Sequence, residues 1–309
     1  LRYRRLGEPQ RGTRRDRGRA GHGHRREPRG FPGCDPGPEG LHRRGQWRRA
    51  RPWHPRGGHD LWPHGWGHPL RRGPREAPGL IGKVLGEKSS ATTAELVAAI
   101  QWAVDEGAVV INMSLGFDFP GLVRWWTGHG LEVELATSRA LAQYQDNVRF
   151  FDHLVGLLRA RGALEPSALL VAAGNESKRQ VRADYAIEAG PPAAAEGIVA
   201  VAALGTLGSP HEVLAVAPFS NTRAAVAGPG MDIYPARAGG GYTIMNGTSM
   251  ASPHVAGVAA LWAERQLNRS GSVTISGLRS RLRGTARLEK IPGADYMDVG
   301  DGLVAAPKD

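Results

Sequence analysis

Three mainly apolar runs constrain the fold of this chain most strongly. They are VVINMSLG at 109–116, ALLVAAGNES at 168–177 and GIVAVAAL at 197–204. A strand with one face in water alternates apolar and polar residues, whereas the apolar parts of these runs are nearly continuous. They therefore predict strands that are buried on both faces, as in a parallel sheet covered by helices.

Segments with helical periodicity separate these runs. The stretch TTAELVAAIQWAVDEGA at 92–108 has apolar residues at helical spacing, and either Thr92 or Thr93 can serve as its N-cap. The shorter run LIGKVLG at 80–86 predicts a further strand. Residues 132–162 predict a pair of helices, whose apolar face would consist of Leu135, Leu141, Tyr144, Phe151, Leu154 and Leu158.

The first quarter of the chain differs sharply from the rest. Residues 1–79 contain 20 Arg and 7 acidic residues but no Lys, Val, Ile, Met, Ser or Asn, whereas residues 80–309 contain 20 basic and 22 acidic residues. The net charge of +11 therefore arises in the first quarter. Because Arg, Gly and Pro favour disorder and strands need branched aliphatic residues, we expect an irregular segment over 1–79 and a folded domain over 80–309.

The segment NGTSMASPHVAGVAALW at 246–262 carries the chemistry. A Gly-Thr-Ser turn leads into a helix of small residues, which places Ser249 at the helix N-terminus. Backbone N–H groups and the positive end of the helix dipole converge there, and they suit a serine that attacks a carbonyl. We expect Pro253 in the first helical turn, where its missing N–H costs little. A capped helix with a structural serine is the simpler interpretation of Gly-Thr-Ser alone.

The eleven-residue run GTSMASPHVAG at 247–257 resembles the nucleophile segment of the subtilisin-like serine peptidases, the subtilases or peptidase S8 family. AAGN at 172–175 resembles the family's oxyanion-hole turn, and SLG at 114–116 resembles its substrate-binding strand. The resemblance extends from Leu80 to Asp309. It implies a three-layer α/β/α fold with a mostly parallel sheet, and a serine endopeptidase that cleaves peptides or proteins through an acyl-enzyme.

The resemblance also implies roles for single residues. Ser249 matches the nucleophile and Asn175 the side-chain donor to the oxyanion. Ser114, Leu115 and Gly116 match the strand that pairs with the substrate backbone, a form of β-augmentation. His254 lies inside the nucleophile helix, where the family has a structural histidine. We assign no cofactor and no metal-binding residue: the resemblance leaves calcium open, but no carboxylate cluster with loop spacing stands out in this sequence to support it.

The base and its orienting carboxylate, which a serine nucleophile needs, are not readable in the sequence as written. The family motifs D-[ST]-G and H-G-T-H-V-A-G are absent. A reading frame displaced by one base can supply both: RPWHPRGGH at 51–59 can encode GHGTHVAGT, and GHGHR at 21–25 can encode VMDTG. RRGPR at 71–75 can encode GVAPG, a further family landmark. We therefore expect residues 12–76 to be out of frame and the chain as written to be inactive.

Two alternatives belong to other functional classes. Twenty arginines with interleaved Trp can form an arm that binds nucleic acid through phosphates, but off-frame translation of GC-rich DNA yields the same mixture, so we do not expect nucleic acid as a partner. The second alternative is a pseudoenzyme that binds peptides without cleaving them. No signal peptide or membrane span is apparent, and the localisation is left open. The single cysteine, Cys34, excludes a disulfide within 80–309.

Overall fold

The computed structural model describes residues 2–5, 47–49, 79–86, 90–160, 168–207, 213–237 and 240–308. Its main sheet has the order β10-β8-β7-β5, and all three pairings along this path are parallel. Strand β9 adds an antiparallel partner to β8. The strands are β5 (Val110–Met113), β7 (Ala168–Ala172), β8 (Val199–Leu207), β9 (Val213–Val216) and β10 (Val226–Pro229).

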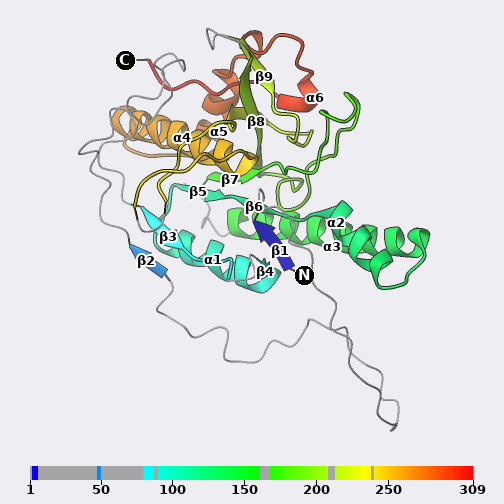
Figure 1. Cartoon of the computed structure of the whole chain (residues 1–309). Coiled ribbons are helices and arrows are strands. Elements are labelled where there is room, and N and C mark those ends of the chain that lie inside the picture. The colour runs from blue at the N-terminus through cyan, green and yellow to red at the C-terminus, as the bar shows by residue number, and fades with distance from the viewer. Residues whose placement is uncertain are drawn as a thin grey trace.

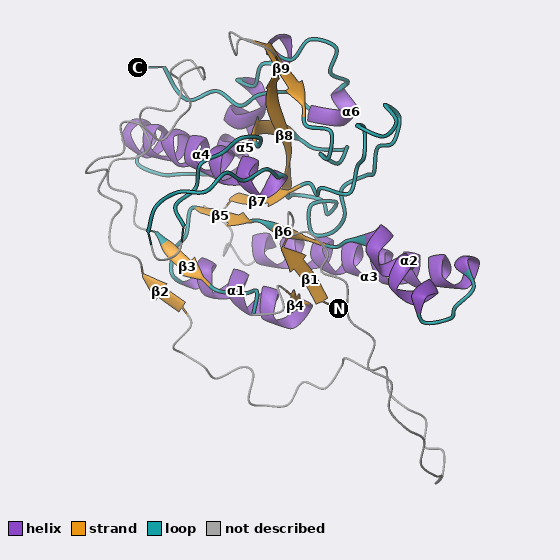
Figure 2. Cartoon of the chain, viewed as in Figure 1, coloured by secondary structure: helices purple, strands orange, loops and turns teal. Residues whose placement is uncertain are grey.

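Helices cover both faces of this sheet (Figures 1 and 2). On β7, Leu169 and Val171 pack into one core with α1 (Thr93–Asp105) and α3 (Val133–Ala160). The intervening Leu170 packs into a second core with α4 (Thr248–Ser270) and α5 (Ile275–Gly284). Successive strand residues point to opposite faces, so an apolar run fills both cores. The expected three-layer α/β/α fold is therefore present.

The first helix starts where the sequence indicates. Thr92 is its N-cap: the Thr92 hydroxyl accepts from the Glu95 N–H at 3.2 Å, and the Glu95 carboxylate accepts from the Thr92 N–H at 2.7 Å. This reciprocal pair is a capping box, which satisfies two backbone donors at once. Of the two candidates for the cap, the structure selects Thr92.

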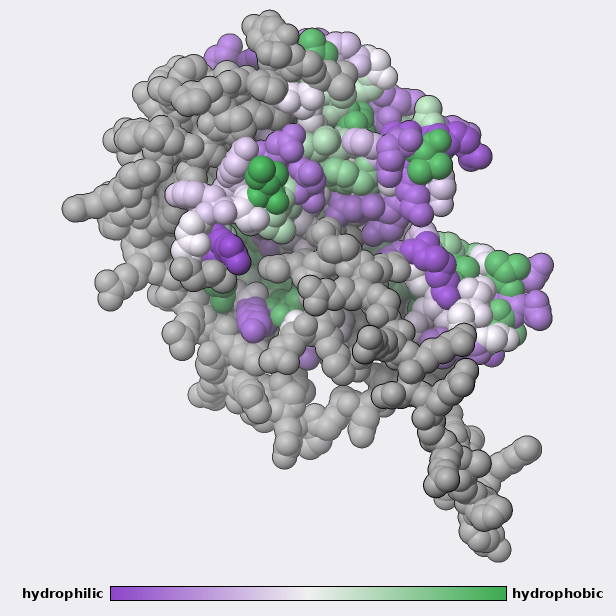
Figure 3. All heavy atoms as spheres, viewed as in Figure 1, coloured by the Kyte–Doolittle hydropathy of each residue, from purple (hydrophilic) through white to green (hydrophobic). Residues whose placement is uncertain are grey.

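The region 132–162 differs from the expectation of a helix pair. It contains one helix of 28 residues, α3, and the second helix of the hairpin precedes it as α2 (Phe119–Gly128). Leu135 and Leu141 are 47% and 45% exposed rather than part of the apolar face. The buried stripe of α3 runs through Ala136 and Ala140, and one position along a helix turns a side chain by about 100°. Hydrophobic residues therefore appear among hydrophilic ones on the α2–α3 hairpin (Figure 3).

Two small sheets involve the N-terminal quarter, which the sequence predicts to be irregular. Strand β1 (Arg2–Arg5) lies between β4 (Ser90–Thr92) and β6 (Leu115–Gly116) and is antiparallel to both. Strand β2 (Trp47–Arg49) pairs with β3 (Leu80–Gly82). Strand pairing uses backbone groups, so an Arg-rich segment can take part without apolar side chains. The remainder of 1–78 lies outside the described residues, so β2 is the one described part of the segment 12–76 in which we expect the frame displacement.

The C-terminal segment contributes to both cores, with Ile291 and Val299 in the first and Val304 in the second. It continues from α5 through the 3₁₀ helix η1 (Leu288–Lys290) to α6 (Tyr296–Val299). Trp262 of α4 donates its indole N–H to the Ala305 carbonyl at 2.9 Å. The guanidinium groups of Arg265 and Arg281 lie 5.6 and 5.7 Å from the Trp262 ring. These contacts hold the last residues of the chain against the helix that carries Ser249.

Candidate active site

The N-terminus of α4 meets the turn that follows β7. Asn175 Oδ1 accepts from the Thr248 backbone N–H at 2.8 Å and from the Thr248 hydroxyl at 3.0 Å. The Gly174 N–H donates to Thr248 Oγ1 at 3.2 Å. The N-cap residue of α4 is Gly247, which has no side chain to cap the helix. The Asn175 side chain provides the cap instead. Ser249, the second residue of the helix, is buried, with 4% of its surface exposed.

The other half of the Asn175 amide is unused. Its Nδ2 is buried and has no hydrogen-bond partner among the described residues. A Cβ atom placed on Gly247 would lie 3.5 Å from Asn175 Nδ2 and 3.6 Å from the Ser249 backbone nitrogen. Both nitrogens thus flank one point beside Gly247, where glycine leaves space. A buried donor without a partner costs about 1–3 kcal/mol, so its retention calls for an explanation.

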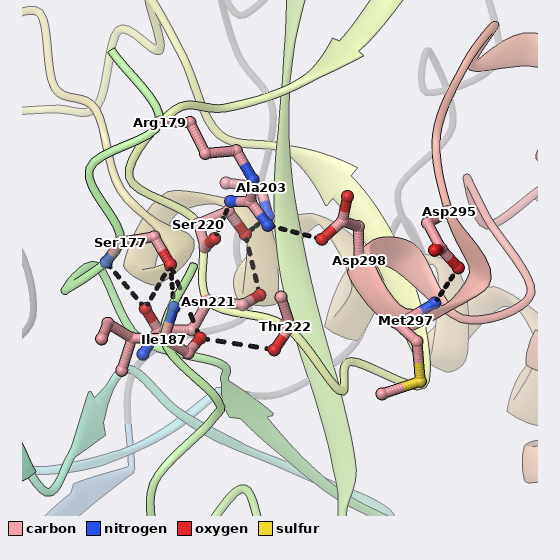
Figure 4. Close-up of polar contacts among 10 residues, drawn as sticks. All are labelled: Ser177, Arg179, Ile187, Ala203, Ser220, Asn221, Thr222, Asp295, Met297 and Asp298. Carbon is pink, nitrogen blue, oxygen red and sulfur yellow. Dashed lines mark hydrogen bonds and ion pairs between the residues drawn. The ribbon is translucent and has the colours of Figure 1, made fainter. Parts of the chain in front are cut away.

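A second amide supports this turn. Asn221 Oδ1 accepts from the backbone N–H groups of Glu176 and Ser177, both at 3.0 Å. Its Nδ2 donates to the Glu176 carboxylate at 2.6 Å, and that carboxylate also accepts from the Asn175 N–H at 3.0 Å. Figure 4 shows Asn221 next to Ser177, whose hydroxyl donates to Asn221 Oδ1 at 3.1 Å. The backbone that carries Asn175 is therefore fixed from one side by Asn221 and Glu176.

The network continues toward the C-terminal segment. Arg179 donates to the Ser220 carbonyl and forms an ion pair with Asp298 of α6 at 2.5 Å (Figure 4). The Ser220 hydroxyl accepts from the Ala203 N–H on β8 at 3.0 Å. Residues 220–221 are thereby connected to the central sheet and to α6, and the turn after β7 rests on a rigid support.

Glu176 has an unusual ionisation equilibrium. Burial, and secondarily the negative charge of Asp118, raise its pKa from 4.5 to about 7, while the hydrogen bonds from Asn221 and from backbone N–H groups act in the opposite direction. Asp118 is the N-cap of α2 and lies 3.8 Å from Arg124. Glu176 therefore titrates near neutral pH, directly beside Asn175.

Glu176→Gln should remove a pH dependence of stability. Because the folded-state pKa lies above the ordinary value, the folded chain holds the proton more tightly, and stability falls as pH rises from about 4.5 to about 7. The loss is at most about 3 kcal/mol. Glutamine can accept the same two hydrogen bonds, so the variant should be more stable than the parent at pH 8 and nearly equal to it at about pH 4, below the unfolded-state pKa. Urea unfolding at both pH values measures the free energy of unfolding, and substitution of the exposed Glu134 by Gln is the control. The prediction would be contradicted if the free energy of unfolding changed with pH by the same amount in the parent and in Glu176→Gln.

The three residues expected to bind substrate backbone lie at two kinds of position. Leu115 and Gly116 form β6 and are buried, and their backbones pair with Arg5 and Arg4 of β1. Ser114 precedes this strand, and its hydroxyl donates to the Ser249 carbonyl at 3.0 Å. The structure therefore brings Ser114, Asn175 and Ser249 together, while the edge of β6 carries a strand from the chain's own N-terminus.

Comparison with known proteins identifies the fold family. A model of the subtilase family, Peptidase_S8, matches residues 77–300. This chain belongs to the subtilases. It is 31% identical to the thermostable alkaline protease of Halalkalibacterium halodurans, over 72% of this chain and 48% of that protein. It is 32% identical to subtilisin DY of Bacillus licheniformis, over 66% and 59% of the two chains. The subtilase domain thus spans about half the length of these relatives.

A solved structure of a psychrophilic protease aligns with 73% of the subtilase chain and 68% of its own, with a TM-score of 0.48 and 25% identity. Two further properties concern only the described part of the subtilase. No helix there combines the length and apolar character needed to cross a membrane. No group of three or more His, Cys, Asp or Glu side chains there is arranged to hold a metal ion.

The described histidines of this subtilase lie at three positions, and the side chain of each contacts a backbone carbonyl four residues earlier. His129 contacts Trp125 and His153 contacts Arg149, both on the α2–α3 hairpin, and His254 contacts Met250. Burial lowers the pKa of His254. The half-buried His254 imidazole is thus held against the backbone of its own helix, and none of the three histidines is assigned as the base.

Sequence reasoning missed Glu176, Asn221 and Ser252 as parts of the site. Glu176 directly follows AAGN, and Asn221 lies in PFSNTR, a segment that resembles the family but carries no obvious chemistry. Their importance comes from contacts across the fold, such as the 45-residue separation between Glu176 and Asn221. Ser252 occurs within the nucleophile run, and only its contact with Ser114 distinguishes it from the other small residues there.

Proposed function

We propose that this subtilase domain belongs to a serine endopeptidase in which Ser249 attacks the peptide carbonyl and forms an acyl-enzyme. The observation that carries the proposal is the pair of N–H donors, Asn175 Nδ2 and Ser249 N, that flank one point at the N-terminus of α4. Donors fixed around one point stabilise the oxyanion that develops in acyl transfer, and they need no reorganisation during the reaction. The family relationship supports the same chemistry.

Peptide or protein is the corresponding substrate. Its extended backbone would pair with Leu115 and Gly116 of β6, by the β-augmentation that a strand edge permits. The peptide and β1 would then compete for the same edge, because Arg4 and Arg5 pair with these two residues.

The competition between β1 and a peptide can be measured directly. A chain that lacks residues 1–8 should bind a fluorescent peptide of that sequence, LRYRRLGE, more tightly than the full chain does, since the edges of β4 and β6 would lose their internal partner. Fluorescence anisotropy gives both affinities. A scrambled peptide of the same composition is the control for simple charge attraction. Equal affinities of the two chains would contradict the competition.

We further propose that the chain as written is inactive because its Asp and His motifs are displaced by one base over residues 12–76. In the corrected frame the imidazole would be encoded across Pro52 and Trp53 and would activate Ser249. The carboxylate would be encoded across Gly23 and His24 and would orient that imidazole. The test is labelling of Ser249 by a serine-directed phosphonate, read by mass spectrometry and compared between the present and the corrected chain, with Ser249→Ala as the negative control.

A further inference from the structure

Pro253 lies deeper in α4 than its sequence position suggests. The helix begins at Thr248, so the proline is its sixth residue and falls in the second turn rather than the first. In an α-helix each N–H donates to the carbonyl four residues earlier, and proline has no N–H. The carbonyl that loses its helical donor is that of residue 249, the candidate nucleophile.

The Ser114 hydroxyl donates to this carbonyl. Ser114 Oγ lies 3.0 Å from the Ser249 oxygen, although the two residues are 135 positions apart. Ser114 is half-buried and Ser249 is buried, so the hydrogen bond is protected from water. Buried carbonyl groups are nearly always paired, and here the missing helical N–H is replaced from another element.

The direction of the neighbouring bonds follows from counting protons. A hydroxyl has one proton and two lone pairs, and the Ser114 proton goes to the Ser249 carbonyl, which can only accept. The Asn112 amide Nδ2 at 3.3 Å can only donate to Ser114. The Ser252 hydroxyl at 3.2 Å must therefore also donate. Ser114 thus uses all of its hydrogen-bonding capacity, which fixes its rotamer.

We propose that Ser114 is a positioning residue: its hydroxyl replaces the hydrogen bond that Pro253 cannot make and thereby holds the backbone of Ser249 in place. The inference rests on the proposed function for its catalytic consequence, but the contact itself does not depend on activity. Ser114 thus has a role beyond the substrate contact expected from its motif, because the same residue connects the turn before β6 to the nucleophile helix.

The test is a double-mutant cycle of Ser114→Ala and Pro253→Ala. Ser114→Ala should slow phosphonate labelling of Ser249 in the frame-corrected chain by about tenfold, the effect of one net hydrogen bond. Pro253→Ala would restore a backbone N–H directed at the Ser249 carbonyl. In the Pro253→Ala background, Ser114→Ala should therefore change the labelling rate by less than about twofold. Equal effects of Ser114→Ala in both backgrounds would overturn the proposal.

A second readout does not require catalysis. In the present chain labelled with ¹⁵N-serine, the Ser249 amide resonance is assigned by its loss in Ser249→Ala. We expect Ser114→Ala to shift this resonance and to lower Tm, and we expect both changes to shrink in the Pro253→Ala background. Ser252→Ala is the matched control, since it removes a neighbouring hydroxyl but leaves the Ser114 donation intact, and it should change the resonance less than Ser114→Ala does.

The possible outcomes separate the two proposals. A coupled cycle in resonance and Tm, together with no labelling of the corrected chain, would support the positioning contact and contradict the proposed function. An unchanged Ser249 resonance in Ser114→Ala would overturn the positioning contact whatever the labelling result. If Ser114→Ala does not fold, Ser114→Cys under reducing conditions replaces it, because a thiol is a weak donor of similar shape and should give intermediate values.

Discussion

Re-encoding residues 12–76 in the displaced frame should increase the rate of Ser249 labelling by about a millionfold. This magnitude is the one measured for subtilisin, a member of the same family, when its histidine is removed: only the oxyanion hole and binding then remain. The physical reason is that a serine hydroxyl at neutral pH is a weak nucleophile without a base to take its proton. The measurement is the second-order rate of phosphonate labelling for the two chains side by side.

The controls distinguish the explanations. Ser249→Ala in the corrected chain should abolish labelling, and a corrected chain in which the restored histidine is replaced by alanine should return to the rate of the present chain. Equal labelling of the present and corrected chains would mean that a histidine of the present sequence serves as base, and the frame hypothesis would be wrong. No labelling of either chain would favour a peptide-binding pseudoenzyme. The bases of the gene over Arg51–His59 give an independent check, since they must spell GHGTHVAGT in the displaced frame.

Asn175→Asp should lower the labelling rate of the corrected chain by about 10²–10³-fold, the loss known for the corresponding donor in subtilisin. Aspartate retains an oxygen that can accept from the Thr248 N–H, so the cap of α4 is preserved, but it lacks the Nδ2 donor. Its negative charge also opposes an oxyanion. The variant therefore tests the proposed catalytic role of Asn175 Nδ2 separately from the capping role of Asn175 Oδ1.

Thermal unfolding is the matched measurement for this variant. Asn175→Asp should leave Tm within a few degrees of the parent, since a carboxylate at a helix N-terminus is favourable. Asn175→Ala loses the cap as well, so it should lower the free energy of unfolding by about 0.5–2 kcal/mol and should have a lower Tm than Asn175→Asp. A normal labelling rate in Asn175→Asp would exclude Asn175 as an oxyanion donor, although the family assignment would stand.

Local patterns in the sequence were sufficient for the architecture. Continuous apolar runs can be satisfied only by strands with a core on each side, and the alternation of Leu169 and Leu170 between two cores is the direct consequence. The threonines at 92 and 93 likewise predict the start of α1, because an N-cap is a local feature, and the structure selects Thr92 through its capping box with Glu95. The position of Ser249 at a helix start could also be predicted from neighbouring residues, because the Gly-Thr-Ser turn directly precedes the helix.

The amphipathic face of α3 was predicted only in part. Phe151 and Leu158 are fully buried as expected, but Leu135 and Leu141 are exposed. Periodicity shows which residues share a face, yet the sequence does not show how a helix is rotated against the sheet. Small residues such as Ala136 can occupy the buried stripe where the packing is close, and neighbouring leucines then face outward.

The tertiary structure alone decided the fine chemistry of the site. The pKa of Glu176 is raised to about 7 because the fold buries this side chain and, secondarily, because of the negative charge of Asp118, and no residue adjacent in sequence predicts that burial. The Ser114 hydroxyl meets the Ser249 carbonyl because β5 and α4 lie side by side in the fold, and Pro253 leaves that carbonyl without its helical donor. Contacts between distant segments depend on how elements pack, whereas strands, caps and turns depend on neighbours along the chain. The sequence by itself therefore determined the layers and the candidate nucleophile, and the packing of those layers determined what surrounds that residue.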